Sequence, residues 1–230
     1  MTNDLHTEVE EPKPERPSLF GMIMSPREQL ERVRENPKIL VAILIVTALT
    51  IVGMLLMLNS IDFIGNDPNL SGMSEEEMMM VTMASQIGFV FTGLFTPVFS
   101  ILLISVVHII IAKITQSEAS FKQLFSMNTH IYIIGAISVL LNGLVFMLIG
   151  GDPEKLVTGL NSIVGADGVL GAVLNSIEVF SIWTLIVTAM GLQIVARFSK
   201  VLSWSVVIGI FIVGLVFQMI SAGLNTMIGV

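Results

Sequence analysis

One uninterrupted stretch decides the fold: residues 39–58 read ILVAILIVTALTIVGMLLML, twenty residues without a single charge. Crossing the hydrocarbon core of a bilayer takes about 20 residues of α-helix. In lipid every backbone amide must be hydrogen-bonded within the protein, and a continuous helix achieves this. The stretch therefore predicts a membrane-spanning helix.

Similar apolar regions follow along the rest of the chain. They cover residues 78–112, 131–149, 169–196 and 201–225. The acidic and basic side chains in these four regions are His108 and Glu178 alone. We place the spans at about 39–58, 90–112, 131–149, 175–196 and 201–225, so that residues 39–230 form one five-span membrane domain. The predicted fold class is all-α: a polytopic integral membrane protein with a five-helix transmembrane bundle and short amphipathic interfacial helices.

The composition supports this fold class and narrows the function. Of the 230 residues, 53% are hydrophobic and 13% are charged, and the mean hydropathy is +0.87. A soluble domain has about twice that share of charged residues. The net charge of −7 argues against a nucleic-acid partner, because such binding needs clustered lysine and arginine. Without cysteine, disulfides, zinc–thiolate sites and iron–sulfur clusters are excluded.

The basic residues predict the orientation of the spans. Ten of the 11 lysines and arginines fall on the same side of the membrane: before the first span, between the second and third spans, or between the fourth and fifth. Lys155 alone falls on the opposite side, between the third and fourth spans. Loops rich in lysine and arginine stay in the cytoplasm. We therefore expect the N-terminus in the cytoplasm and the C-terminus outside the cell.

The N-terminal region divides into two parts. Residues 1–17 carry five acids, two bases and three prolines, which indicates a disordered acidic cytoplasmic tail. Residues 18–38 predict an amphipathic cytoplasmic interface helix, with a capping-box pattern from Ser25 to Glu28 and proline at the first helical position. One interpretation is a helix that docks a partner through Arg27, Arg32 and Arg34. The other is a helix that lies on the lipid surface.

A second cytoplasmic segment precedes the third span. Residues 120–127 place Phe121, Leu124 and Phe125 on one face at helical spacing. Phe121 and Phe125 are further candidates for contact with a partner, although an interfacial anchor explains them equally. Outside the cell, Asp152-Pro153 predicts the start of another short helix that ends near Gly165.

The second apolar region is longer than one span. A helix from Glu75 to Lys113 would be about 58 Å long, so it must either project from the membrane or bend. Pro97 offers a place to bend, because its ring would strike the carbonyl of Gly93. The sequence leaves open whether Gly93 and Pro97 form a hinge or a static kink.

The chain offers little chemistry within the membrane. Glu178 falls near the outer interface and His108 near the inner one, so neither approaches the midplane. No hydrolase elbow, zinc-protease helix, phosphate loop or metal cluster occurs, so we expect no catalytic, cofactor-binding or metal-binding residue. Small polar residues, such as Ser138 and Asn142, form stripes at helical spacing. Such stripes allow helices to pack closely within one chain or against the helices of another chain, including a second copy of this protein.

The layout resembles a known family. The segment Ser25-Pro26-Arg27-Glu28 leads to Asn36-Pro37-Lys38 directly before the first span, and Phe121-Lys122-Gln123-Leu124-Phe125-Ser126 leads into the third. With five spans and an external C-terminus, the chain is similar to the bacterial branch of the YIP family of five-span membrane proteins, over about residues 19–225.

The resemblance implies a location and a function. It implies the plasma membrane of a bacterium and an accessory subunit of an ABC-type exporter, with permease, ATPase and membrane-fusion components, in defence against a toxic peptide. No catalytic residues are defined for the family, and the eukaryotic contact with small GTPases has no specific counterpart here. The first hypothesis is thus a non-enzymatic interaction protein whose partners are the lipid bilayer and other membrane proteins, namely an ABC permease and a membrane-fusion subunit. The alternative is a small transporter or lipid-handling protein acting alone.

Overall fold

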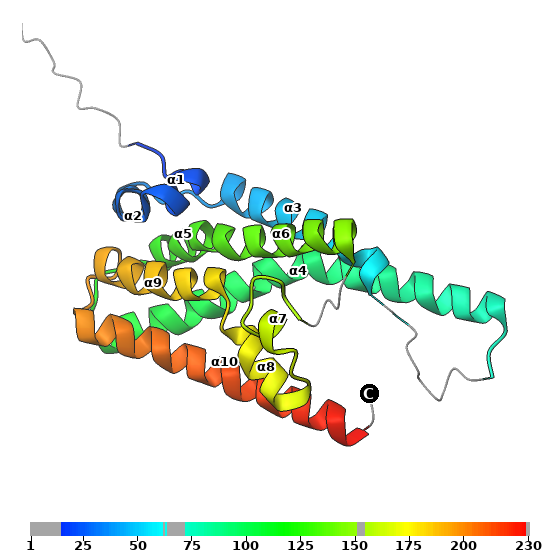
Figure 1. Ribbon diagram of the computed structural model, residues 1–230. Helices are drawn as coiled ribbons and strands as arrows, with labels where there is room; N and C mark the ends of the chain where they lie inside the picture. The colour runs from blue at the N-terminus through cyan, green and yellow to red at the C-terminus, as the bar shows by residue number, and fades with distance from the viewer. Residues whose placement is uncertain (1–14, 62, 64–71, 151–154, 229–230) are drawn as a thin grey trace, which may run out of the picture.

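The computed structural model describes residues 15–61, 63, 72–150 and 155–228. The predicted tail, residues 1–17, therefore lies outside the described residues except for its last three. The described chain consists of helices joined by turns and loops, with one isolated antiparallel bridge between Gly159 and Glu178. Figure 1 shows the long helices α3, α4, α6, α9 and α10 running roughly alongside one another in a bundle. The all-helical membrane fold is confirmed.

Within the described residues, four helical segments are long and apolar enough to cross a membrane: Leu40–Ser60, Glu75–Ile114, Phe121–Ile149 and Lys200–Leu224. The first contains α3 (Leu40–Met57) and the 3-10 turn η1 (Leu58–Ser60), and the second is α4 (Glu75–Ile114). The third joins α5 (Phe121–Ile131) to α6 (Ile133–Ile149), and the fourth belongs to α10 (Lys200–Ile228). A fifth apolar helix, α9 (Val179–Ile194), is shorter.

The predicted fourth span, 175–196, is not one continuous helix. The short helix α8 (Gly168–Ser176) ends before Ile177, and α9 starts after Glu178. Glu178 has extended backbone angles, with φ −118° and ψ 148°, and it pairs with Gly159. This break could not be predicted from the local sequence, because Gly159, which pairs with Glu178, lies in the loop after α6.

The N-terminal region also differs from the prediction. Residues 18–38 contain two helices, α1 (Leu19–Met24) and α2 (Pro26–Glu35), in place of one. Ser25 ends α1 by donating its backbone N–H to the Gly21 carbonyl, and its side chain does not cap α2. The expected capping by Ser25 is therefore wrong, although α2 does start at Pro26 and end before Asn36 as expected.

Two other capping boxes are present. Ser74 and Glu77 cap α4, and Ser120 and Gln123 cap α5 in the same reciprocal way. The hydrogen bonds from Ser74 lower the pKa of Glu77, which lies well before the apolar part of α4. With 40 residues, α4 is about 60 Å long, and its N-terminal part runs beyond the other helices (Figure 1).

Among its described residues, the loop after α6 is only partly helical. The helix predicted to start at Asp152-Pro153 has its first residues outside the described part, and from Lys155 the chain forms turns. Only Asn161–Val164 is helical (α7), and Gly165, in the left-handed region with φ 67°, ends it as predicted. This loop is drawn inward by the bridge to Glu178.

The closest helix contact joins α3 to α6. A Cβ placed on Gly143 would lie 2.3 Å from the Gly53 carbonyl oxygen, and one on Gly53 would lie 2.8 Å from the backbone of Val139 and Leu140. Only glycine allows the two backbones to come this close, which is the usual role of small residues between membrane helices.

Candidate functional site

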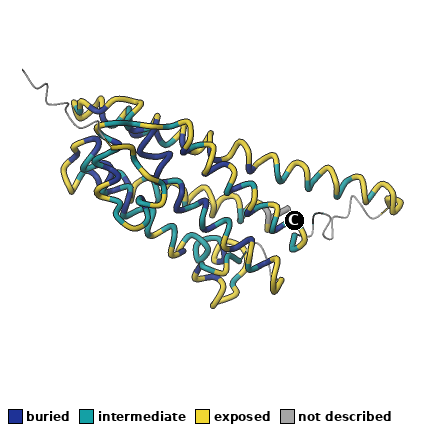
Figure 2. Tube along the Cα trace, turned by 90° about the horizontal axis from the view of Figure 1, so that it is seen from above, coloured by how far each residue is buried: buried dark blue, intermediate teal, exposed yellow. Residues whose placement is uncertain are grey.

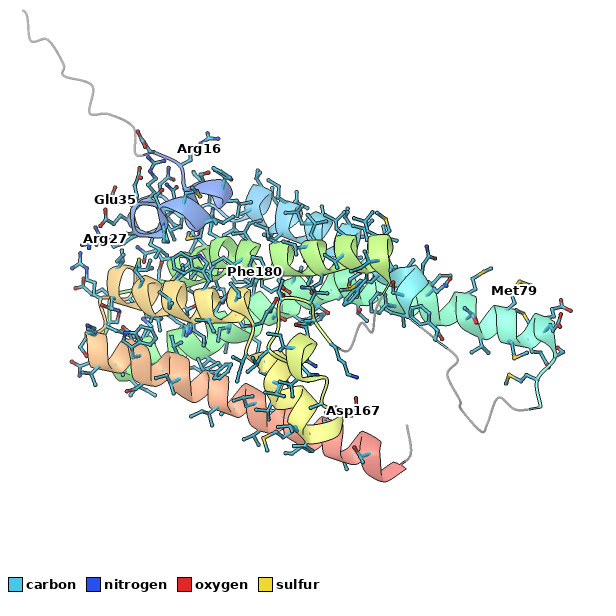
Figure 3. All side chains as sticks on the ribbon, viewed as in Figure 1. Arg16, Arg27, Glu35, Met79, Asp167 and Phe180 are labelled. Carbon is cyan, nitrogen blue, oxygen red and sulfur yellow. The ribbon has the colours of Figure 1, made fainter. Side chains whose placement is uncertain are left out.

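The residues predicted to contact a partner lie at one end of the bundle, which we call the basic end. It comprises α1, α2, the start of α3, the end of α4, the start of α5 and the turn between α9 and α10. Buried residues gather there (Figure 2). Figure 3 places Arg16, Arg27 and Glu35 at this end, and Met79 at the far end of α4.

Helix α2 is fixed to the bundle by its apolar face. Its buried residues are Gln29, Leu30 and Val33. A Cβ on Gly191 of α9 would meet Leu30 at 3.2 Å and Met127 of α5 at 2.7 Å, so the three helices meet at this glycine. The Gln29 side chain also accepts a 2.8 Å hydrogen bond from the Ser18 amide, which ties α1 to α2.

Helix α5 holds the end of α2 and the segment that leads into α3 through one hydrogen bond to the backbone of each. Gln123 Nε2 donates to the Arg34 carbonyl at 2.7 Å, and Ser126 Oγ donates to the Lys38 carbonyl at 2.6 Å. The oxygen of the same Gln123 amide accepts from the Ser120 amide at 2.9 Å. The Arg34 carbonyl belongs to the last turn of α2, where carbonyls have no partner within the helix, so this hydrogen bond stabilises the end of α2. Sequence reasoning missed both contacts, since the partners are almost 90 residues apart.

The predicted arginines form the outward face of α2. The Arg27 side chain is 80% exposed and lies 3.5 Å from Glu31, and Arg34 lies 3.7 Å from Glu35. Arg32 is less exposed and pairs with Glu28 at 2.5 Å and with Glu15. Exposed ion pairs of this kind contribute little to stability. The outward face of α2 is therefore a charged surface on a rigidly held helix.

The two predicted phenylalanines occupy different environments. Their ring centroids lie 5.6 Å apart on α5. Phe121 is 41% exposed, whereas Phe125 is half-buried and packs against the hydrophobic core. Only Phe121 is placed to contact another molecule without a change in α5.

The predicted hinge residues are buried in α4. A Cβ on Gly93 would lie 2.6 Å from Met54 Sδ of α3. Pro97 lies inside α4, which continues as helix on both sides of it. Gly93 thus allows α4 to approach α3, and a hinge at Gly93 and Pro97 stays a prediction.

The sequence did not identify the most polar buried site, which centres on Glu178. This carboxylate is only 5% exposed. It accepts hydrogen bonds from the hydroxyls of Ser138 on α6, of Thr158 at 2.6 Å and of Ser181 at 3.2 Å. Among the described residues, no lysine, arginine or histidine forms an ion pair with it. Hydroxyl donors instead satisfy its carboxyl oxygens.

Asn142 connects the loop to this carboxylate site. Its side-chain oxygen accepts a 2.8 Å bond from the Val157 amide, and its Nδ2 donates to Thr158 Oγ1 at 3.1 Å. Ser138 lies 11 residues before the end of α6, or about 16 Å along the helix. Non-helical backbone is tolerated at such depth only where protein or a cavity surrounds it. A cavity of about 390 Å³ between α6, α9 and α10 borders Glu178.

His108 belongs to a separate buried cluster, which joins α4 to α5. The Asn128 side-chain amide donates to Ser105 Oγ at 2.8 Å and lies 3.2 Å from His108 Nδ1. Asn128 and His130 face the interior and bond to neighbouring side chains or backbone. Within the described residues, no three histidine or carboxylate side chains gather as metal ligands would.

Comparison with known proteins places this architecture in a family. The Yip1 domain matches residues 20–222. The chain is similar to the membrane protein YknW of Bacillus subtilis (strain 168), with 30% identity over 217 residues that cover 94% of each chain. No solved structure matches. An all-helical membrane bundle with this match over nearly its whole length belongs to the Yip1 family of membrane proteins.

Proposed function

We propose that this protein is a non-enzymatic interaction subunit that assembles with an ABC-type exporter in the plasma membrane of a bacterium. The export complex would serve resistance to a toxic peptide, as the family resemblance implies. The proposal rests on the way in which α2 is packed against the bundle. Its inner face is locked to α5 and α9, while its charged outer face has no cover among the described residues.

In this proposal the basic end faces the cytoplasm. Lysine and arginine are concentrated in the loops at this end, and loops rich in these residues stay in the cytoplasm. The chain contains no cysteine, so single cysteines can be introduced without a background. A membrane-impermeant maleimide applied to intact cells should label a cysteine at position 163, which lies on α7, and not one at position 31, which lies on α2. The reverse pattern would overturn this orientation.

The experiment that tests the proposal is affinity purification of the tagged protein in mild detergent, with quantitative mass spectrometry. An ABC permease and a membrane-fusion subunit should be recovered at near-stoichiometric amounts. The variant Arg27→Glu/Arg34→Glu should lose most of this recovery, because it reverses two charges on the outer face of α2. The matched control is Lys113→Glu/Lys200→Glu, which makes the same charge change at exposed positions of α4 and α10. Recovery of no exporter subunit, or equal loss in both variants, would contradict the proposal.

A second candidate function is supported by the site around Glu178. A buried carboxylate beside a cavity of about 390 Å³ fits a small transporter that binds a cationic group, since intramembrane ionisable residues commonly mark such pathways. Under this alternative, Glu178→Gln would abolish flux of the solute while the exporter subunits were absent from the purified protein. Under the first proposal, the same variant would leave the recovery of exporter subunits unchanged.

A further inference from the structure

The largest cavity described at the basic end is a groove of about 610 Å³. It lies between the segment that leads into α1, the first turns of α3 and the start of α5. Three cations line it, Arg16, Lys38 and Lys122, and no carboxylate does. We propose that this groove binds one anionic phospholipid of the surrounding leaflet, with its phosphate among these cations and an acyl chain along α3.

The cations are available for a ligand. All three side chains are exposed, and within the described part of the chain none of them forms an ion pair. Glu15, the neighbour of Arg16, is already paired with Arg32. Three cations around one groove repel each other unless an anion binds between them. A phosphate diester supplies that anion.

The position of Lys38 is set before any ligand arrives. Its carbonyl accepts the 2.6 Å hydrogen bond from Ser126 Oγ. Lys122 is in the first turn of α5, whose start is fixed by the capping box of Ser120 and Gln123. The backbone of both lysines is thus fixed by neighbouring elements of the fold, so binding has to order only their side chains.

The remainder of the groove is apolar and continues into the bilayer. Leu40 and Val41 are 72% and 69% exposed, and Leu44 and Ile45 extend the same uncovered surface by another turn of α3. A free phosphate or a nucleotide would use the cations and leave this surface unused. A phospholipid matches both parts, because its charged head and its acyl chain lie in the same order as the cations and the apolar turns. Basic pockets next to membrane helices are known to take anionic headgroups.

The test is native mass spectrometry of the full chain in detergent, titrated with phosphatidylglycerol, phosphatidylcholine or inorganic phosphate. We expect one phosphatidylglycerol to bind tightly, with phosphatidylcholine weaker by at least tenfold and inorganic phosphate not detected. The groove variant is Lys38→Gln/Lys122→Gln, which should weaken phosphatidylglycerol binding at least about tenfold, since each cation near an anionic lipid contributes a factor of about five.

The matched control is Lys113→Gln/Lys200→Gln, two exposed cations at the same end of the bundle but outside the groove. It should bind phosphatidylglycerol as the wild type does. Equal weakening in the control would show that only the overall charge acts, and would overturn the site. Equal binding of both lipids would overturn the role of the cations. Phosphate binding as tight as lipid binding would show an anion site in place of a lipid site.

Discussion

The two ends of the bundle are held together by different means. At the basic end, α1, α2, α5 and α9 pack together through buried apolar side chains, and one hydrogen bond from α5 holds the Arg34 carbonyl at the end of α2. At the opposite end, α4 projects beyond its neighbours, and α10 contacts mainly α8 and α9. There a polar loop turns inward to Glu178. The basic end therefore presents a fixed surface, while the other end is organised around the buried carboxyl group of Glu178.

The largest expected effect concerns the close backbone contact between α3 and α6. Gly143→Ala places a Cβ 2.3 Å from the Gly53 carbonyl oxygen, so α3 and α6 must separate. We expect a loss of about 3 kcal/mol or more in stability, measured as a lower thermal unfolding temperature in detergent. The control is Gly135→Ala on the same helix, where a Cβ meets nothing within 4 Å. That variant should be neutral or slightly more stable, because alanine favours helix; equal losses would contradict the packing argument.

The second prediction concerns the opposite end. Glu178→Leu removes the acceptor for the hydroxyls of Ser138, Thr158 and Ser181. Buried donors left without a partner cost about 1–3 kcal/mol, so the unfolding temperature should fall. Glu178→Gln keeps an acceptor oxygen and should lose less. If the leucine variant were as stable as the wild type, Glu178 would not organise this end of the bundle.

The third prediction concerns the lock between α5 and α2. Gln123→Ala removes the hydrogen bond to the Arg34 carbonyl and half of the cap of α5. Hydrogen exchange should increase in residues 26–35 while the α3 and α6 amides keep their protection, since the loss of about 1 kcal/mol is local. Gln193→Ala is the control, because Gln193 bonds only within its own helix, to the Ala189 carbonyl. Unchanged exchange in α2 would mean that its apolar face alone holds it.

The smallest expected effect is at the exposed charges of α2. Arg27→Ala breaks a pair with Glu31 at an 80% exposed side chain, and such pairs contribute about 0–1 kcal/mol. The thermal unfolding temperature should therefore stay within about 2 °C of the wild type. A large drop would indicate that the outer face of α2 is part of the core and not a surface for a partner.

The features that sequence reasoning found are local ones. The spans at α3, α4 and α10 follow from long apolar runs of sequence. The start of α2 at Pro26 follows from the missing proline amide.

The features that it missed depend on contacts between distant segments. The Gly53–Gly143 contact and the bond from Gln123 to the Arg34 carbonyl each join residues about 90 positions apart. The break before α9 arises because Glu178 pairs with the loop at Gly159. A single apolar run with one glutamate predicts a continuous span with that glutamate near the membrane interface. The burial of Glu178 becomes apparent only when the loop around Gly159 is seen to fold inward.

The most direct test of the interaction proposal is site-specific photo-crosslinking at both ends of the molecule in living cells. Benzoylphenylalanine would replace Glu31, which is 46% exposed on the outer face of α2, or Met79, which is 60% exposed at the far end of α4. If the outer face of α2 contacts the exporter, we expect adducts with an ABC permease or ATPase subunit from position 31 and none from position 79. Adducts from position 79 alone, or from neither position, would contradict it.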